Sequence, residues 1–192
     1  IADCTGHGVP GAFMSLLGLT LMNEVVNEFD DITAGKFLDL LKYKVTSSMH
    51  QRNEANARDG MEVALCIFDF DNMKVDFAGA YNPVYLIRNN KLIETKGDRM
   101  AICYNPQKNS NFTSHELPLY SGDMIYLFTD GYADQVSENT YKKFRKDRFK
   151  ETLLSIHKDK LSAQKDELEK RFLEWKGNYE QIDDILIVGI KI

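Results

Sequence analysis

The chain has 192 residues, of which 43% are hydrophobic and 28% are charged, which is the composition of a packed globular domain. Its net charge of -5 argues against nucleic-acid binding, because nucleic acids require a basic surface. Three scattered cysteines without a Cys-x-x-Cys pair argue against a disulfide scaffold and favour a cytoplasmic location. No apolar run approaches the roughly 18 residues of a membrane span. The sequence therefore predicts a single domain over residues 1–192.

The first fourteen residues place an aspartate directly before a glycine-rich turn. A hydrophobic lead-in ends at Asp3, then Gly6, Gly8 and Gly11 follow, and an apolar helix pattern begins at once. Because no turn or capping residue precedes Ile1, we expect the chain to begin in the middle of a fold. An upstream sensor domain, or an upstream segment that tethers a longer protein to a membrane, is left open.

Hydrophobic spacing predicts helices in the first part of the chain and strands in the middle. Apolar residues recur at helical spacing over residues 11–28 and 33–50, and Asp30 and Asp31 are candidate caps of the second helix. From Met61 on, apolar runs separated by Asp-Asn and Asn-Asn turns predict hairpins. The predicted strands are residues 61–70, 73–80, 84–88, 91–95, 112–117 and 124–129.

The last part of the chain is predicted to be helical and to end in a strand. Residues 140–160 carry eight Lys and Arg side chains, for which we favour a solvated helix face over a phosphate-binding patch. A helix that begins at Ser162 ends at Gly177, and residues 185–192 form a strand. Helices, then strands, then helices and a final strand indicate an α+β fold rather than alternating βαβ units.

Three aspartates lie at the ends of strand-like runs: Asp3, Asp130 in a Thr-Asp-Gly sequence, and Asp183 in an Asp-Asp pair. Oxygen-only ligands favour Mg²⁺ or Mn²⁺, and a cation would relieve the repulsion between clustered carboxylates. Two such ions about 4 Å apart can activate a shared water and bind a phosphoryl group, so the pattern predicts metal-assisted phosphate-ester hydrolysis. Taken alone, Asp130 fits an ordinary turn, and His7 fits a structural role better than that of a general acid.

Six motifs in this chain resemble the sporulation stage II E and RsbU-type serine phosphatases, the bacterial branch of the metal-dependent, type 2C-like protein phosphatases. The resemblance runs the whole length of the chain. It implies an α-β-β-α sandwich of two antiparallel sheets with Mg²⁺ or Mn²⁺ between their loops. It also implies hydrolysis of phosphoserine or phosphothreonine on a protein, often an antagonist of an anti-sigma factor. The motifs are Asp-x-Thr-Gly-His-Gly at 3–8, Asp-Gly-Met at 59–61, Gly-Ala-Tyr-Asn-Pro at 79–83, Gly-Asp at 122–123, Thr-Asp-Gly-Tyr-Ala-Asp at 129–134 and Gln-x-Asp-Asp-Ile at 181–185.

The same resemblance implies roles for single residues. Asp3 would bridge two metal ions, and the backbone carbonyl of Cys4 would reach one of them. Asp130 and Asp183 would bind the other ion, so these three aspartates form the implied catalytic centre. Asp134 is expected to make a structural hydrogen bond. The residues implied to support the centre from around it are His7, Asp59, Gly131 and Asp184.

One element of the family pattern has no counterpart in the chain. The Gly-Asp-Phe segment that supplies the first metal aspartate would lie before Ile1. We therefore expect the chain to lack its first strand, to be impaired as a phosphatase, and to expose a sheet edge through which it dimerises. Two alternatives stay open: a non-catalytic signalling module of the same fold, and a phosphatase that acts on small molecules.

Overall fold

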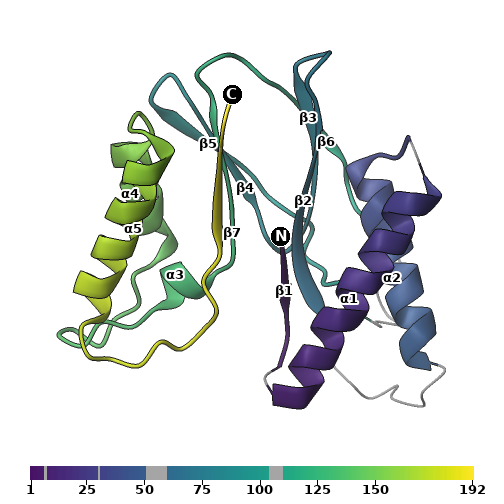
Figure 1. The fold of residues 1–192 in the computed structure, drawn as a ribbon, viewed down its shortest axis with the longest axis horizontal. Coiled ribbons are helices and arrows are strands. Elements are labelled where there is room, and N and C mark those ends of the chain that lie inside the picture. The colour runs from purple at the N-terminus through teal and green to yellow at the C-terminus, as the bar shows by residue number, and fades with distance from the viewer. Residues whose placement is uncertain (7, 30, 51–59, 104–109) are drawn as a thin grey trace. The chain divides into compact units, whose positions relative to one another are not determined.

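The computed structural model describes residues 1–6, 8–29, 31–50, 60–103 and 110–192. The chain divides into two compact units, one of residues 1–84 and 95–119 and the other of residues 85–94 and 120–192. Each unit contains a four-stranded antiparallel sheet with its own helices (Figure 1). The predicted α+β class, with two antiparallel sheets flanked by helices, is confirmed. The prediction of one domain over residues 1–192 stays a prediction.

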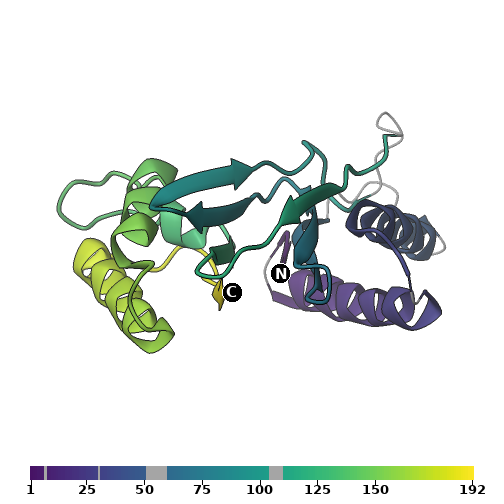
Figure 2. The same cartoon turned by 90° about the horizontal axis from the view of Figure 1, so that it is seen from above.

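The first unit has the sheet order β1-β2-β3-β6, and two helices, α1 and α2, lie side by side along this sheet (Figures 1 and 2). Buried apolar residues of both helices, among them Leu21 and Leu38, pack into one core with Met61 and Val63 of β2. Both predicted helices and the predicted hairpin of residues 61–80 are confirmed. The elements are β1 (Ala2–Cys4), α1 (Gly8–Glu28), α2 (Ala34–His50), β2 (Met61–Asp69), β3 (Lys74–Ala80) and β6 (His115–Pro118).

Helix α1 is more apolar than the sequence analysis allowed. It has 21 residues, and its most apolar window reaches a mean hydropathy of 1.4. By length and composition alone it could cross a membrane, so the expectation that no apolar run approaches that length was wrong. A core helix passes the same test, but only 28% of this window is buried. Met14, Leu21 and Val25 of α1 belong to the core of the first unit, whereas Leu16 and Leu19 are exposed.

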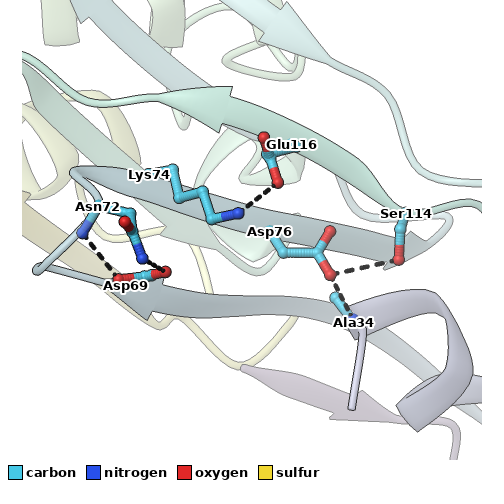
Figure 3. Close-up of polar contacts among 7 residues, drawn as sticks. All are labelled: Ala34, Asp69, Asn72, Lys74, Asp76, Ser114 and Glu116. Carbon is cyan, nitrogen blue, oxygen red and sulfur yellow. Dashed lines mark hydrogen bonds and ion pairs between the residues drawn. The ribbon is translucent and has the colours of Figure 1, made fainter. Parts of the chain in front are cut away.

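The N-terminus of α2 is capped from the sheet. The amide of Ala34 donates to Oδ2 of Asp76 on β3 (2.7 Å), and the amide of Gly35 donates to Oγ of Ser114 (2.8 Å), as Figure 3 shows for the first of these bonds. These acceptors satisfy two of the free amides of the first turn. Thr33 adds a local cap, because its hydroxyl accepts from the amide of Lys36 (3.4 Å). The cap therefore comes from Thr33 and from two residues distant in sequence, not from Asp31 as expected. Asp30 lies outside the described residues.

The strand predicted at residues 112–117 begins later, at His115. The amide of Phe112 donates to Oδ1 of Asp39 (2.9 Å), and that of Thr113 donates to Oδ2 of Asp98 (2.7 Å). Side chains therefore bind the amides that a longer strand would have used. Within the sheet, Lys74 and Glu116 join β3 to β6 by an ion pair of 2.7 Å, and Asn72 binds Asp69 in the β2–β3 turn (Figure 3).

The second unit has the sheet order β5-β4-β7-β8 and a core rich in aromatic rings. Tyr132 contacts Phe149 of α4 and Phe172 of α5, with ring centres 5.0 and 5.4 Å apart. These contacts hold both helices to the segment that follows β7. The hairpin of residues 84–95 and the last strand are confirmed. The elements are β4 (Val84–Arg88), β5 (Lys91–Thr95), β7 (Met124–Phe128), α3 (Gly131–Asp134), α4 (Lys146–Ile156), α5 (Leu161–Lys176) and β8 (Ile187–Lys191).

Candidate functional site

Asp130 follows the end of a strand whose five residues are all buried. The preceding residue, Thr129, is 4% exposed and ties this end to the segment before β8. Its hydroxyl donates to the carbonyl oxygen of Asp184 (2.9 Å) and accepts from the amide of Leu186 (3.0 Å). The amide of Thr129 also donates to the carbonyl oxygen of Leu186 (3.0 Å). These bonds hold the chain at Asp184 beside Asp130.

Gly131 leaves the space that this approach requires. A Cβ atom at this position would overlap the backbone carbonyl oxygen of Asp184. Any other residue would therefore push the chain at Asp184 away from Asp130. In the Thr-Asp-Gly sequence, threonine binds the neighbouring segment, glycine makes room for it, and the aspartate between them directly precedes helix α3.

Asp130 shares its surroundings with two further carboxylates. Partial burial, followed by the negative charges of Asp134 and Asp183, raises the pKa of Asp130, and the positive charge of Lys146 opposes this rise. Asp134 is held by Lys143, whose Nζ donates to Oδ2 at 2.7 Å. Asp134 thus makes the structural contact expected of it.

Asp183 and Asp184 are both exposed. The Asp183 carboxylate accepts a hydrogen bond from the amide of Asp184 (2.8 Å), and its carbonyl oxygen accepts one from Nε2 of Gln181 (2.8 Å). One carboxylate oxygen of Asp183 is therefore engaged locally. Asp184 contacts the Asp130 region through its carbonyl oxygen, by the bond from Thr129.

Asp3 lies in the first unit, on β1. There it pairs in register with Glu62 of β2, and the next residue, Cys4, pairs with Met61. Beyond β1, Thr5 fixes the chain: its amide donates to the carbonyl oxygen of Gly60 (2.9 Å), and its hydroxyl accepts from the Gly60 amide (2.7 Å). Burial raises the pKa of the Cys4 thiol, which keeps this side chain neutral.

The predicted site residues thus fall into three groups. Asp130, Gly131, Asp183 and Asp184 come together in the second unit, Asp3 and Cys4 lie in the first, and His7 and Asp59 lie outside the described residues. Among the residues that the structure describes, no three His, Cys, Asp or Glu side chains form a metal-binding cluster.

Sequence reasoning did not place basic side chains beside Asp130. The signal was available as the dense run of Lys and Arg after residue 140, which we interpreted as a helix face. The structure instead puts Lys143 against Asp134 and brings Lys146 within electrostatic reach of Asp130.

The structure resembles solved phosphatase domains over its whole length. The SiaA-PP2C domain of Pseudomonas aeruginosa matches with a TM-score of 0.90 and 27% sequence identity, over 100% of this chain and 74% of that chain. The PP2C domain of SpoIIE from Bacillus subtilis, solved with a fragment of its regulatory domain, matches with a TM-score of 0.75 and 14% identity, over 100% and 53%. The catalytic domain of PstP, solved with two manganese ions, gives a TM-score of 0.65 and 17% identity, over 98% and 84%. A comparison with curated protein sequences finds no match.

These likenesses define the fold as that of the PP2C-type phosphatase domains. The family model of Stage II sporulation protein E (SpoIIE) matches residues 1–192, the whole of the chain. The chain therefore belongs to the SpoIIE family, as the sequence motifs implied.

Proposed function

We propose that this protein is a metal-dependent phosphatase that hydrolyses phosphoserine or phosphothreonine on a signalling protein. The observation that carries the proposal is the meeting of Asp130 with the Asp183–Asp184 segment at the end of β7, in a chain of the SpoIIE family. Neighbouring carboxylates raise the cost of each other's charge, and a bound cation removes that cost. The arrangement therefore suits a cation site better than it suits a purely structural turn.

The donor chemistry of this region fits Mg²⁺ or Mn²⁺. Asp130 and Asp183 offer only oxygen, which hard cations prefer, and the raised pKa of Asp130 reflects an excess of negative charge around it. These two residues would hold one ion. The family resemblance implies that Asp3 and the carbonyl oxygen of Cys4, which both lie in the first unit, are further metal ligands. When bound, such ions polarise a phosphoryl group and lower the pKa of a bound water.

The chain's own residues would set the geometry of this site. Thr129 and Gly131 fix the position of Asp130 relative to the Asp183–Asp184 segment, one by hydrogen bonds and the other by leaving space. Lys143 forms an ion pair with Asp134, so that this carboxylate already has a protein cation as its partner. Asp130 and Asp183 would then remain as the metal-binding pair.

A phosphoprotein is the substrate that the family membership supports best. We place an antagonist of an anti-sigma factor among the candidates and include an upstream sensor domain, a homodimer and a cytoplasmic location in the proposal. The SpoIIE relative was solved with part of a regulatory domain, which supports the sensor. Three cysteines without a disulfide among them support the location.

The test is hydrolysis of a phosphoserine peptide in Mn²⁺ by this chain and by a version that is extended at the N-terminus. Asp130→Asn should lower kcat/KM by at least about 100-fold, because it removes a metal ligand. Asp166→Asn, on the exposed face of α5, is the matched control and should change nothing. Calorimetric titration with Mn²⁺ reads out binding without turnover. Undiminished activity of Asp130→Asn would refute the assignment, and a preference for nucleotide or sugar phosphates over phosphopeptides would refute the substrate class.

A further inference from the structure

Residues 142–150 form a strongly basic segment that the proposed function leaves largely unused. Six of these nine residues are Lys or Arg, and Asp147 is the one acidic residue among them. We call residues 142–150 the basic segment. It follows α3 in the chain and runs into the first turns of α4 (Figure 1).

Three cations of the basic segment have structural roles within the second unit. Lys143 binds Asp134 at 2.7 Å, and Lys150 binds Glu94 of β5 at 2.9 Å. The guanidinium carbon of Arg148 lies 4.1 Å from the centre of the Trp175 ring, in position for a cation–π contact. Packing of the fold therefore accounts for half of the segment's positive charge.

The other three cations, Lys142, Arg145 and Lys146, are exposed. The side chain of Arg145 is 75% exposed, and its Nη2 lies 3.8 Å from Oδ2 of the equally exposed Asp147, a contact worth little in water. The amide of Arg145 donates to the carbonyl oxygen of Ala133 at 2.7 Å. This bond connects the basic segment to α3, the helix that Asp130 directly precedes.

Folding stability does not explain these exposed cations. Arg145 has φ 78° and ψ 147°, a backbone conformation that is almost restricted to glycine. Cations in the first turn of α4 also oppose the helix dipole, and no side chain caps this helix. A merely solvated helix face, the interpretation that we favoured from sequence, would be more stable with acidic residues here. The cations therefore call for another role.

We propose that Lys142, Arg145 and Lys146 form a docking surface for acidic residues that flank the phosphoserine of a protein substrate. This inference rests on the proposed function, because the surface borders the Asp130 region. The argument for this docking surface is charge complementarity. The chain has a net charge of -5 and repels an acidic partner at long range, whereas these side chains provide local attraction beside the proposed catalytic residues.

The test compares two phosphoserine peptides, one with Asp and Glu on both sides of the phosphoserine and one with Ala and Ser. The variant carries Lys142→Glu and Arg145→Glu, and it keeps Lys146 because the charge of this lysine acts on Asp130. We expect its kcat/KM for the acidic peptide to fall at least about tenfold, mainly through KM, because exposed charges at the rim of a site act on association. Its activity on the neutral peptide should stay within about twofold. The preference of the parent protein for the acidic peptide should also weaken steeply with salt.

A matched control changes net charge by the same amount elsewhere in the second unit. Lys158→Glu and Lys160→Glu alter two exposed lysines beyond the far end of α4 and should leave the peptide preference intact. If the control reproduces the loss, or if the basic-segment variant loses both peptides equally, the docking surface is refuted. Vesicles rich in phosphatidylserine provide a further arm. Vesicle binding that is lost in the variant while its peptide preference is kept would overturn the proposal in favour of a membrane surface.

Fluorescence anisotropy of the labelled acidic peptide, without metal, separates the two proposals. If neither peptide is hydrolysed by the parent protein or by its N-terminally extended version, the proposed function fails. Anisotropy still decides the docking surface, because weaker binding to the variant than to the control supports it and equal binding overturns it. Melting temperatures of both variants, compared with the parent, identify any loss that is due to unfolding.

Discussion

Two aspartates at opposite ends of the same buried strand have opposite surroundings. Asp123 immediately precedes β7, is 2% exposed, and accepts two hydrogen bonds from the guanidinium of Arg88, at 2.9 and 2.6 Å. Asp130 follows β7, is half-buried, and has Asp134 and Asp183 as its acidic neighbours. One carboxylate is matched with a cation, and the other is crowded by anions.

The pKa values of the two aspartates express this difference. Burial alone would raise the pKa of Asp123, but the bonds from Arg88 and from the Tyr120 amide lower it on balance. For Asp130, burial and the neighbouring carboxylates act in the same direction and raise the pKa. Asp123 therefore favours the folded state when it is charged, whereas the charge of Asp130 works against folding. A cost of that kind is expected where a residue is kept for function.

The largest expected effect on stability comes from removing the carboxylate of Asp123, which is paired with Arg88. Asp123→Ala leaves the guanidinium of Arg88, which is 21% exposed, without its carboxylate and should cost about 3–5 kcal/mol of unfolding free energy. Urea unfolding measures this cost. Asp166→Ala, on the exposed face of α5, is the control and should change stability by less than about 0.5 kcal/mol.

A double variant sharpens the same prediction. Replacing both partners, with Arg88→Leu and Asp123→Leu, should recover much of the loss, because no buried charge is left unpaired. The contribution of Asp123 is present above the ordinary pKa of an aspartate and is lost as pH falls through its lowered value, so the cost of Asp123→Ala should shrink in acid. A double variant as unstable as Asp123→Ala alone would contradict this account.

The comparison also shows which features of the molecule could be predicted from the sequence. Strand β7 and the turn at Asp130 were predictable, because hydrophobic runs and Asp-Gly turns are local signals. The ion pair of Arg88 with Asp123 and the cap of α2 by Asp76 join residues 35 and 42 positions apart, which no local pattern reveals. The link between the Asp130 region and the Asp183–Asp184 segment is more distant still, with 55 positions between Thr129 and Asp184. It was predicted through the family resemblance and the similar strand-end setting of both aspartates. Local sequence rules had assigned the basic segment to solvent, because they do not show what lies beside it.

A smaller effect is expected from the glycines at the two ends of β7. Gly131→Ala should cost about 2 kcal/mol, because its Cβ overlaps the carbonyl oxygen of Asp184 and the backbone must shift. In Gly122→Ala the added Cβ has no atom within 4 Å, but the backbone would have to keep a φ of 92°, which costs about 1 kcal/mol for alanine. Phosphatase activity should separate the two variants, because only Gly131→Ala displaces the Asp183–Asp184 segment. Equal activity of both would show that this segment is not part of the site.

The smallest effect, and the one of opposite sign, is expected at Asp130. Asp130→Asn removes a charge that disfavours folding, so it should stabilise the chain at neutral pH by up to about 1 kcal/mol, a modest amount because solvent screens a half-exposed group. A raised pKa in the folded state means that the native chain holds its proton more tightly, so the penalty grows as pH rises through that pKa. The gain from Asp130→Asn should therefore be present at pH 7 and should vanish below the ordinary pKa of an aspartate. Urea unfolding of both proteins across this pH range measures it. A variant that is both less active and more stable would identify Asp130 as a residue kept for function, whereas a loss of stability at pH 7 would mean that its carboxylate serves the fold as Asp123 does.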